Sequence, residues 1–497
     1  MIVGSDPAVR CQGSLLMHRT TIVSTPTRTT TRAATIGLLF GTTLCLCPGL
    51  AQAATLQVGP GKTYAKPCAA IAAAKAGDVI EIEASGTYTG DTCAWTTDNL
   101  TVRGVNGRAK IDITGTTPAQ QKGLFTIYAN NATVENLELS GAAISVAAGN
   151  NGAGIRHQGL NLTVRGCYFH DNQNGILGAP STGGMGQVLI EYSEFAKNGA
   201  GDGYSHNMYI GNYAKFTLQH SYSHRGNVGH LVKTRAYASH ILYNRITDEP
   251  GGTASYEVDI PNAGTAYVIG NLIEQASTTQ NPALIAFGEE GVPAGYDNRL
   301  FVVGNTLLNT KGSGTFVMNQ AQAAGVLTNN IFYGGGTVSS QATAIQTTNF
   351  VAPAMGDPKF VNLAAFDVHL ATGSPCADKG SDPGQGAGMP LVPSFEYVHP
   401  QSRVVRLVAG SALDIGAYEL GNTGGSGTPD GGSDTPDGGS SGGGGSEPDG
   451  STGGGGSSAE GCSCNLSARQ QVPGPLALFS VLLVTAAPLL RRRRHAR

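Results

Sequence analysis

The densest group of ionisable side chains lies between Ser205 and Asn262, in the sequence SHNMYIGNYAKFTLQHSYSHRGNVGHLVKTRAYASHILYNRITDEPGGTASYEVDIPN. Its segments HNMYIG, GHLVKTR and SYEVDI carry a lysine, an arginine, two carboxylates and an amide. A deprotonated lysine can act as a general base, an arginine can hold a carboxylate, and carboxylate and amide oxygens suit calcium. These residue types indicate chemistry on an acidic substrate, provided that the fold brings the three segments together.

A short repeated pattern predicts a fold that does so. Each copy has an apolar residue, two variable residues, a small or amide residue, a variable residue and a second apolar residue. One coil of a parallel β-helix has about the length that separates the copies. In four consecutive copies the fourth position is asparagine, which predicts a stacked amide ladder. We therefore expect an all-β, right-handed parallel β-helix of about eight or more coils. The copies begin at Val134, Val164, Ile190, Leu218, Ile241, Val268, Val302 and Leu327.

The alternation of side chains along a strand sorts the charged segments, because the interior of a coil must be apolar. In GHLVKTR it directs Lys233 and Arg235 outward. The same alternation directs Leu231 outward and His230 inward, together with Val232 and Thr234. The same rule applied to the neighbouring coils predicts one outer face shared by six side chains: Asn207, Tyr209, Lys233, Arg235, Glu257 and Asp259.

Each side chain on this face has an expected role in eliminative cleavage of a uronic-acid polymer. That reaction removes a proton next to a carboxylate, so it needs a base and a neutralised carboxylate. Lys233 is the expected base, and Arg235 would hold the acidic sugar. The substrate would also contact Tyr209 and Asn207, and calcium would neutralise its carboxylate. The expected calcium ligands are Glu257, Asp259 and Asn207, which Glu289 and Glu290 of the next coil could extend.

Other interpretations of the same residues stay open. The charges could form a surface ladder of ion pairs, each worth about 0.2 to 1 kcal/mol. Glu257 and Asp259, with Cα atoms about 6.6 Å apart along a strand, could instead hydrolyse a glycosidic bond. His230 occupies the same coil address as His206, so it is either a stacked structural histidine or part of the catalytic group. For the whole protein, the competing class is a non-catalytic carbohydrate-binding or adhesive surface protein.

Residues 60–420 resemble the right-handed parallel β-helix superfamily typified by pectate lyases. Within it, GHLVKTR followed by an Asn-containing coil is similar to the coil that carries the lysine base of alginate and chondroitin lyases. This resemblance implies Lys233 as the base and Asn207 as a calcium ligand. The next coil departs from the pattern, since it offers Glu257 and Asp259 where an outward arginine is wanted.

Two segments are expected to cover the ends of the β-helix, which occupies residues 101–350. In residues 54–100, an Ala-rich helix at PCAAIAAAKAGD covers the first coil, and Cys68 and Cys93 are expected to form a disulfide. In residues 351–420, DPKFVNLAAFDVHLATGSPCADKG and LDIGAYEL resemble the segment that closes many secreted bacterial β-helix proteins.

The outer parts of the chain predict export and display. Residues 1–53 read as a signal peptide, with Met17 as an alternative start. Residues 421–460 form a Gly, Ser, Asp and Pro linker. Residues 461–497 resemble the Cys-containing C-terminal sorting tails of myxobacterial surface proteins, with an apolar transmembrane segment before four arginines. This resemblance implies processing near Cys462 or Cys464 by a sorting protease; an ordinary membrane anchor is the alternative.

The composition narrows the class of partner. Charged residues make up 13% of the chain and the net charge is −3, without a basic stripe, so nucleic-acid binding is not expected. Abundant glycine with little charge suits extracellular β-structure. We expect a secreted, monomeric, surface-displayed protein whose partners are a polysaccharide, the cell envelope and the sorting protease, and whose function is lyase-type cleavage of acidic sugars.

Overall fold

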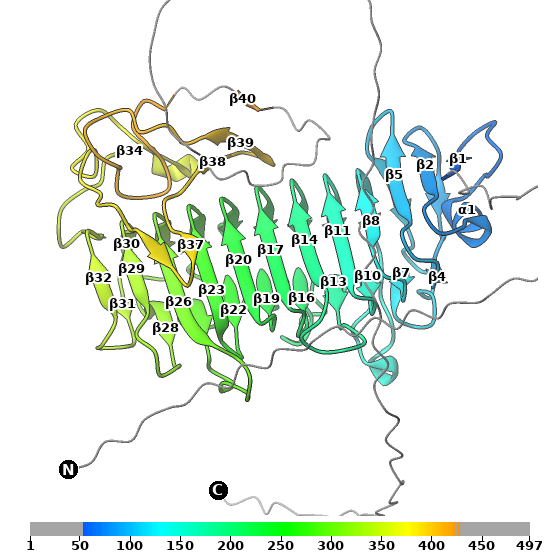
Figure 1. Cartoon of the computed structure of the whole chain (residues 1–497), viewed down its shortest axis with the longest axis horizontal. Coiled ribbons are helices and arrows are strands. Elements are labelled where there is room, and N and C mark those ends of the chain that lie inside the picture. Colours follow the sequence, from blue (N-terminus) through cyan, green and yellow to red (C-terminus); the bar gives the residue numbers. More distant parts are fainter. Residues whose placement is uncertain (1–52, 423–425, 428–497) are drawn as a thin grey trace, which may run out of the picture. The chain divides into compact units, whose positions relative to one another are not determined.

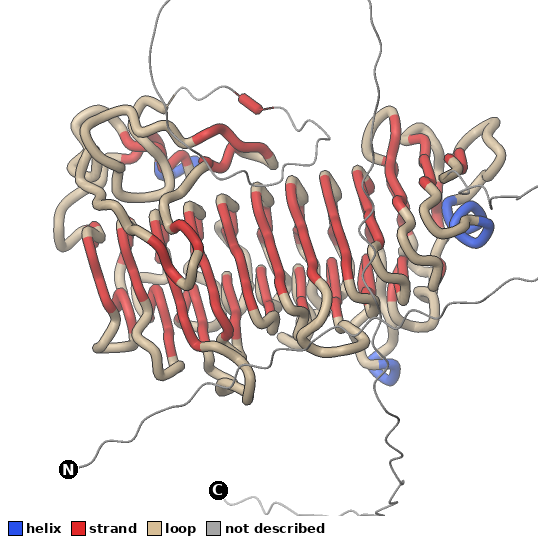
Figure 2. Tube along the Cα trace, in the orientation of Figure 1, coloured by secondary structure: helices blue, strands red, loops and turns tan. Residues whose placement is uncertain are grey.

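The computed structural model describes residues 53–422 and 426–427, in which strands dominate (Figure 1, Figure 2). Most of these strands belong to three parallel sheets, which we name A, B and C. Along each sheet a strand pairs with the strand one coil before it and the strand one coil after it. Each coil thus adds one strand to each sheet, and the predicted parallel β-helix is confirmed.

The strands of each sheet follow one another in chain order. Sheet A contains β1 (Thr55–Val58), β2 (Val79–Glu83), β5 (Thr101–Val105), β8 (Ala132–Glu135), β11 (Asn161–Arg165), β14 (Gln187–Glu191), β17 (Lys215–Gln219), β20 (Ala238–Leu242), β23 (Gly264–Ile269), β26 (Asn298–Val303), β29 (Val326–Thr328) and β32 (Ile345–Thr347). Sheet B contains β3 (Tyr88–Thr89), β6 (Ala109–Asp112), β9 (Leu137–Ser140), β12 (Tyr168–His170), β15 (Glu194–Ala196), β18 (Tyr222–His224), β21 (Arg245–Thr247), β24 (Leu272–Gln275), β27 (Thr306–Asn309), β30 (Ile331–Gly334) and β33 (Phe350–Ala352). Sheet C contains β4 (Cys93–Trp95), β7 (Gly123–Ile127), β10 (Ala153–His157), β13 (Asn174–Gly178), β16 (Met208–Ile210), β19 (Val232–Thr234), β22 (Val258–Ile260), β25 (Ala283–Phe287), β28 (Thr315–Asn319) and β31 (Thr337–Ser339).

The remaining elements lie at the ends and in the turns. They are α1 (Pro67–Ala73), η1 (Val146–Ala148), η2 (Leu363–Ala365), β34 (Phe360–Asn362), β35 (Asp367–Leu370), β36 (Gln385–Gly386), β37 (Met389–Pro390), β38 (Phe395–Val398), β39 (Ser402–Val405) and β40 (Ser426–Gly427). In the described part of the chain, no helix is both long and apolar enough to cross a membrane. The predicted signal peptide, linker and sorting tail fall on residues 1–53 and 421–497, almost all of which lie outside the described residues.

The repeated sequence pattern corresponds to one column of the core. The apolar residues that begin the repeats are direct register partners on successive strands of sheet A, and all are fully buried. Because every coil places an apolar side chain at the same address, the column continues without a gap and removes a large apolar area from water. The column comprises Val134, Val164, Ile190, Leu218, Ile241, Val268, Val302 and Leu327.

The predicted asparagine ladder is also confirmed, at the turn between sheets A and B. In each rung, the asparagine side-chain oxygen accepts the backbone N–H of the residue at the same address one coil earlier, which is Ser221 for the first rung and an asparagine for the others. Asn271 illustrates the pattern: its Nδ2 donates to the carbonyl oxygen of Ile241 at 2.8 Å, and its Oδ1 accepts from the backbone N–H of Asn244 at 2.8 Å. The ladder therefore satisfies buried backbone groups of successive coils, which would otherwise be unpaired.

Asn207 and Glu257 lie inside the coils, so their predicted outward positions are wrong. Alternation holds only within a strand, and each of these residues precedes the first residue of its sheet C strand, where the chain is still turning. Leu231 occupies the matching address and belongs to the core, again contrary to the prediction. The side chain of Asn207 is used inside, where its Nδ2 donates to the carbonyl oxygens of Phe195 and His224 at 3.2 and 2.9 Å.

Of the two inward residues, Glu257 has the higher free-energy cost of burial, because its carboxyl group lacks hydrogen-bond partners. It is fully buried, and neither carboxylate oxygen has a hydrogen-bond partner. The nearby hydroxyl of Thr279 donates to Asp248 instead. Burial, with the neighbouring Asp248 and Glu274, raises the pKa of Glu257 well above 4.5. Burial likewise raises the pKa of Asp248 to about 6 and that of Glu274 to about 7. Glu257 therefore keeps its proton to a higher pH than an exposed glutamic acid does.

The N-terminal end is covered as expected. Helix α1 begins at Pro67, whose fixed backbone angle suits a first helical position, and it buries Ala70 and Ile71 against the first coil. The predicted disulfide between Cys68 and Cys93 is present and ties this helix to β4. In Figure 1 the helix lies at the N-terminal end of the stacked strands.

The segment from residue 357 to 420 lies along the outside of the β-helix (Figure 1). Leu391 packs on the outward side chains of Tyr267 and Phe301 from sheet A. Val368 and Tyr418 pack with Leu272 and other residues of sheet B. The segment thus covers the apolar outer faces of two sheets near the C-terminal coils.

Replacing Asn271 with alanine should unpair several buried backbone groups of the amide ladder. Each unsatisfied buried group costs about 1 to 3 kcal/mol, so we expect a loss of about 3 kcal/mol in the free energy of unfolding. Denaturant unfolding measures this loss. The matched control is Asn161→Ala, because Asn161 makes a similar side-chain contact to Asn131 at an exposed position. Equal losses in the two variants would contradict the structural role of the ladder.

Glu257→Gln should stabilise the protein, increasingly so as the pH rises. The pKa of Glu257 is higher in the folded state than in the unfolded state. Its cost to the free energy of unfolding is therefore smallest below pH 4.5 and grows as the pH rises towards the pKa of the folded state. Glutamine has no proton to lose. At pH 8 the variant should gain about 1 kcal/mol or more over the wild type, since one pKa unit corresponds to about 1.4 kcal/mol.

Urea unfolding at pH 5 and pH 8 tests this expectation, with Glu135→Gln as the control. Glu135 is a partly exposed residue on sheet A that pairs with Arg165. The difference in the free energy of unfolding between Glu257→Gln and the wild type should grow with pH. A difference that stays constant would show that the pKa of Glu257 is not raised by burial.

Candidate functional site

The outer face of sheet C brings three of the predicted site residues into register. Tyr209 of β16 pairs with Lys233 of β19, and Lys233 pairs with Asp259 of β22. The Nζ of Lys233 lies 2.5 Å from Oδ2 of Asp259. Lys233 therefore lies beside the SYEVDI segment of the next coil, as predicted, and its neighbour there is Asp259. Both residues are largely enclosed, since Lys233 is 7% exposed and Asp259 is 0% exposed.

His230 also contacts Asp259, so its predicted inward direction is wrong. Residues 229–231 turn before β19 begins, and Leu231 takes the inward position. The Nε2 of His230 lies 3.2 Å from Oδ2 of Asp259. Its Nδ1 accepts the backbone N–H of Tyr256 at 3.1 Å, which leaves the ring proton on Nε2. Burial, His206 and Lys233 hold the pKa of His230 well below 6.5, so a neutral ring lies beside the carboxylate of Asp259.

Glu289 follows β25 and completes the group around Asp259. Oδ1 of Asp259 and Oε2 of Glu289 are both buried and accept no hydrogen bond from an N–H or hydroxyl group. Burial and the contact with Asp259 raise the pKa of Glu289 to about 9. Glu289 is thus protonated at neutral pH, and its carboxyl group can donate to the neighbouring Asp259. Asp259 links a cation, a neutral imidazole and a carboxylic acid.

Arg235 lies at the more open edge of the site. Its Nη2 contacts the two carboxylate oxygens of Glu290 at 2.9 and 2.8 Å. Its Nε donates to the hydroxyl of Tyr209 at 2.7 Å, and Nη1 donates to Asn262. The side chain of Glu290 is 48% exposed, and the side chain of Arg235 is 22% exposed. This edge therefore presents an arginine whose carboxylate partner is accessible to solvent.

Half-buried tyrosines surround the charged group. Tyr209 lies 5.6 Å from the Arg235 guanidinium and 5.8 Å from the Lys233 ammonium. Tyr237 and Tyr296 stack with ring centroids 3.9 Å apart, and the hydroxyl of Tyr296 donates to the backbone oxygen of Arg235. Aromatic side chains with an apolar face and a polar tip are suited to partly wet binding surfaces.

The ligand set expected for calcium does not assemble. Asn207 and Glu257 point into the coils, and of the three expected ligands only Asp259 lies at the site. Within residues 53–422 and 426–427, no group of three or more His, Cys, Asp or Glu residues could hold a metal ion. The residues at this face therefore do not fit the expected calcium site.

Comparisons with known proteins find similar chains only among solved structures. No protein-family model matches the chain, and a search of curated proteins finds no match. The crystal structure of pectate lyase Pel9A is similar at 15% identity and a TM-score of 0.48, over 75% of this chain and 98% of that chain. The Dettilon tailspike protein is similar at 12% identity and a TM-score of 0.24, over 60% of each chain. At these identities the similarity concerns only the arrangement of the chain.

Proposed function

We propose that the outer face of sheet C binds an acidic polysaccharide and cleaves it by elimination, with Lys233 as the base. The observation that carries this proposal is the register of Tyr209, Lys233 and Asp259, with Arg235 at the open edge. A base, a carboxylate-binding cation and an aromatic surface are the parts that elimination from a uronic acid requires.

The proton transfers can be balanced with residues of the site. Lys233 becomes a base when its proton moves to Asp259 across their 2.5 Å hydrogen bond. The amine then takes the proton from the carbon next to the sugar carboxylate, and the bond to the leaving oxygen breaks as the double bond forms. Glu289 donates its proton to that oxygen. Asp259, which contacts both residues, finally passes its proton to Glu289 and restores the starting state.

The contact between Arg235 and Glu290 supports Arg235 as the residue that binds the substrate carboxylate. A planar guanidinium with two donors to one carboxylate is a favourable arrangement for acidic ligands. Glu290 is partly exposed on a turn, so a sugar carboxylate can replace it at less cost than a buried partner. In the bound state Arg235 would neutralise the charge that otherwise opposes proton removal.

A second candidate function is binding of the same polysaccharide without cleavage. The observation that favours it is the ion pairing of Lys233, whose Nζ lies 2.5 Å from Asp259 and 3.6 Å from Glu290. Hydrolysis has less support, because Glu257 lies inside the coil and Asp259 and Glu289 touch each other. Glycosidases separate their two carboxyl groups by at least about 5 Å.

Replacing Lys233 with glutamine should abolish elimination. A general base contributes about 10²-fold to 10⁴-fold, so we expect a loss of at least about 100-fold in the rate of unsaturated product formation. Ultraviolet absorbance of the unsaturated uronate, measured on alginate, pectate and glycosaminoglycans, follows the reaction. The control is Lys379→Ala, at an exposed lysine of the C-terminal segment. Full activity of Lys233→Gln would exclude Lys233 as the base. If the wild type binds the sugar but forms no product, the non-catalytic binding function is the one supported.

Glu290→Gln should tighten the binding of an acidic oligosaccharide. The variant removes the carboxylate that competes for Arg235, and we expect an affinity about three to ten times higher, in line with the modest energy of an exposed ion pair. Isothermal titration with a galacturonate oligomer measures the effect. Glu135→Gln, which removes an arginine-paired carboxylate from sheet A, should bind as the wild type does. Weaker binding by Glu290→Gln would contradict the assignment of Arg235 as the carboxylate site.

A further inference from the structure

A pocket of about 350 Å³ lies on the turns that connect sheets B and C, and it shares no residue with the site around Lys233. Three successive coils contribute charged side chains to its wall, and the next coil contributes a glycine-rich turn. The lining residues are Asp171, Lys197, Arg225, Gly226, Asn227 and residues 250–253.

The fold places the three charged residues at one coil address. Each of them directly follows a strand of sheet B: Asp171 follows β12, Lys197 follows β15 and Arg225 follows β18. The last residues of these three strands are register partners. All three have a left-handed backbone, with φ of 52°, 55° and 48°. The backbone N–H of Lys197 donates to the carbonyl oxygen of Arg225 at 3.1 Å. The turns are thus stacked, which brings the two cations to the same wall.

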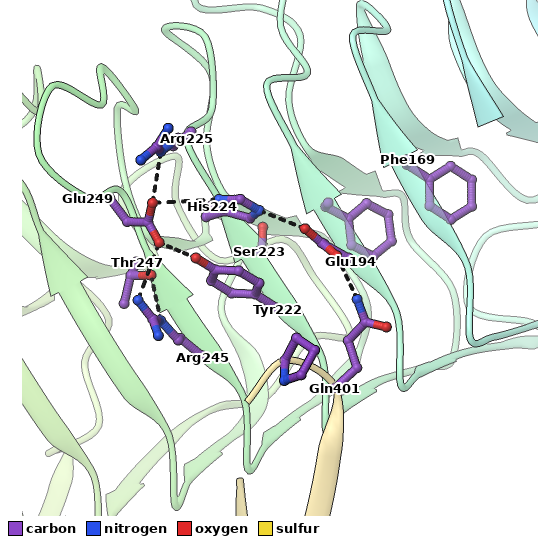
Figure 3. Close-up of polar contacts among 12 residues, drawn as sticks. Phe169, Glu194, Tyr222, Ser223, His224, Arg225, Arg245, Thr247, Glu249 and Gln401 are labelled. Atoms are coloured by element: carbon purple, nitrogen blue, oxygen red, sulfur yellow. Dashed lines mark hydrogen bonds and ion pairs between the residues drawn. The ribbon is translucent and has the colours of Figure 1, made fainter. Parts of the chain in front are cut away.

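A carboxylate behind the pocket holds Arg225 in place (Figure 3). The Nε of Arg225 donates to Oε2 of Glu249 at 2.7 Å. Glu249 also accepts from the hydroxyl of Tyr222 and from Nη2 of Arg245, the latter at 3.3 Å. Burial opposes ionisation of Glu249, but the neighbouring His224, the hydrogen bond from Tyr222 and the charge of Arg245 lower its pKa to about 2. Glu249 therefore stays ionised and fixes the guanidinium at the pocket.

The two cationic side chains at the pocket keep donor groups that are not used inside the protein. The carboxylate of Asp171 is bonded to Nδ1 of His170 at 2.6 Å. Within the described residues, the ammonium of Lys197 has no hydrogen-bond or ion-pair partner, and the two Nη groups of Arg225 have none either. The side chain of Arg225 is 48% exposed and Lys197 is exposed. Two cations with free donors, on a wall set by the fold, can form charge-assisted hydrogen bonds with one anion.

We propose that this pocket binds the anionic group of an acidic sugar, a carboxylate or a sulfate ester, as a second saccharide site. The class of ligand rests on the proposed function of the sheet C face, whereas the site itself rests on Lys197 and Arg225. A polymer that occupied both sites would be held more tightly than by either alone, because the second contact is made at a high effective concentration.

Ligand-observed NMR with the full chain tests the proposal, with galacturonate, galactose 6-sulfate and galactose as probes. The Arg235→Gln variant removes the carboxylate contact on sheet C and leaves the pocket as the remaining site. On that background galacturonate or galactose 6-sulfate should still bind. Adding Lys197→Ala should weaken binding about tenfold, as expected for the loss of one charge-assisted hydrogen bond. Adding Lys379→Ala should not.

The possible results separate the two proposals. Binding that is abolished by Arg235→Gln but unaffected by Lys197→Ala would overturn the pocket and leave the sheet C site intact. Galactose binding as tightly as the acidic sugars, or inorganic sulfate binding as tightly as galactose 6-sulfate, would also overturn an acidic-sugar site. Arg225→Gln provides a second test, with thermal unfolding to confirm that the fold survives. Because Lys197 is exposed, Lys197→Ala remains interpretable if Arg225→Gln does not fold.

Discussion

The parallel register between successive coils is the constraint on which the rest of the structure depends. It aligns Tyr209, Lys233 and Asp259 across three strands of sheet C, and it stacks an apolar column inside sheet A. Neighbouring strands in a sheet lie about 4.8 Å apart, so any two side chains at the same address are in contact distance. In this fold, residues far apart in the sequence are neighbours when they occupy equivalent positions in successive coils. The environment of a charged side chain is therefore set by the residues at the same position in the coils before and after it.

That constraint explains the unusual electrostatics on both sides of the turns between sheets B and C. On sheet C, Asp259 meets Lys233, His230 and Glu289. In the turn after β21, donors surround Glu249 and lower its pKa to about 2. Glu257 lies inside the coil without a hydrogen-bond partner, and burial raises its pKa. Glu249 and Glu257 are close in sequence, yet their pKa values are shifted in opposite directions by the neighbours at each address.

Much of the architecture could be predicted from the sequence because it repeats. The apolar positions from Val134 to Leu327, the ladder that includes Asn271, and the adjacency of Lys233 to the following coil all depend on spacing alone. The wrong predictions, for Asn207, Leu231, Glu257 and His230, share a cause. Strand alternation does not hold for residues that precede the strand, where the turning backbone no longer sends alternate side chains to opposite faces. The sequence indicates Glu289 only as an extension of an acidic site, since turn geometry after β25, rather than spacing, brings it to Asp259.

The most direct test of this account is a crystal structure of the protein with a galacturonate oligomer bound. The account predicts a sugar carboxylate on the guanidinium of Arg235, with Glu290 displaced, a sugar ring against Tyr209, and the carbon next to that carboxylate facing Lys233. An oligomer bound elsewhere, with the contact between Arg235 and Glu290 unchanged, would contradict the assignment of the sheet C face as the saccharide site.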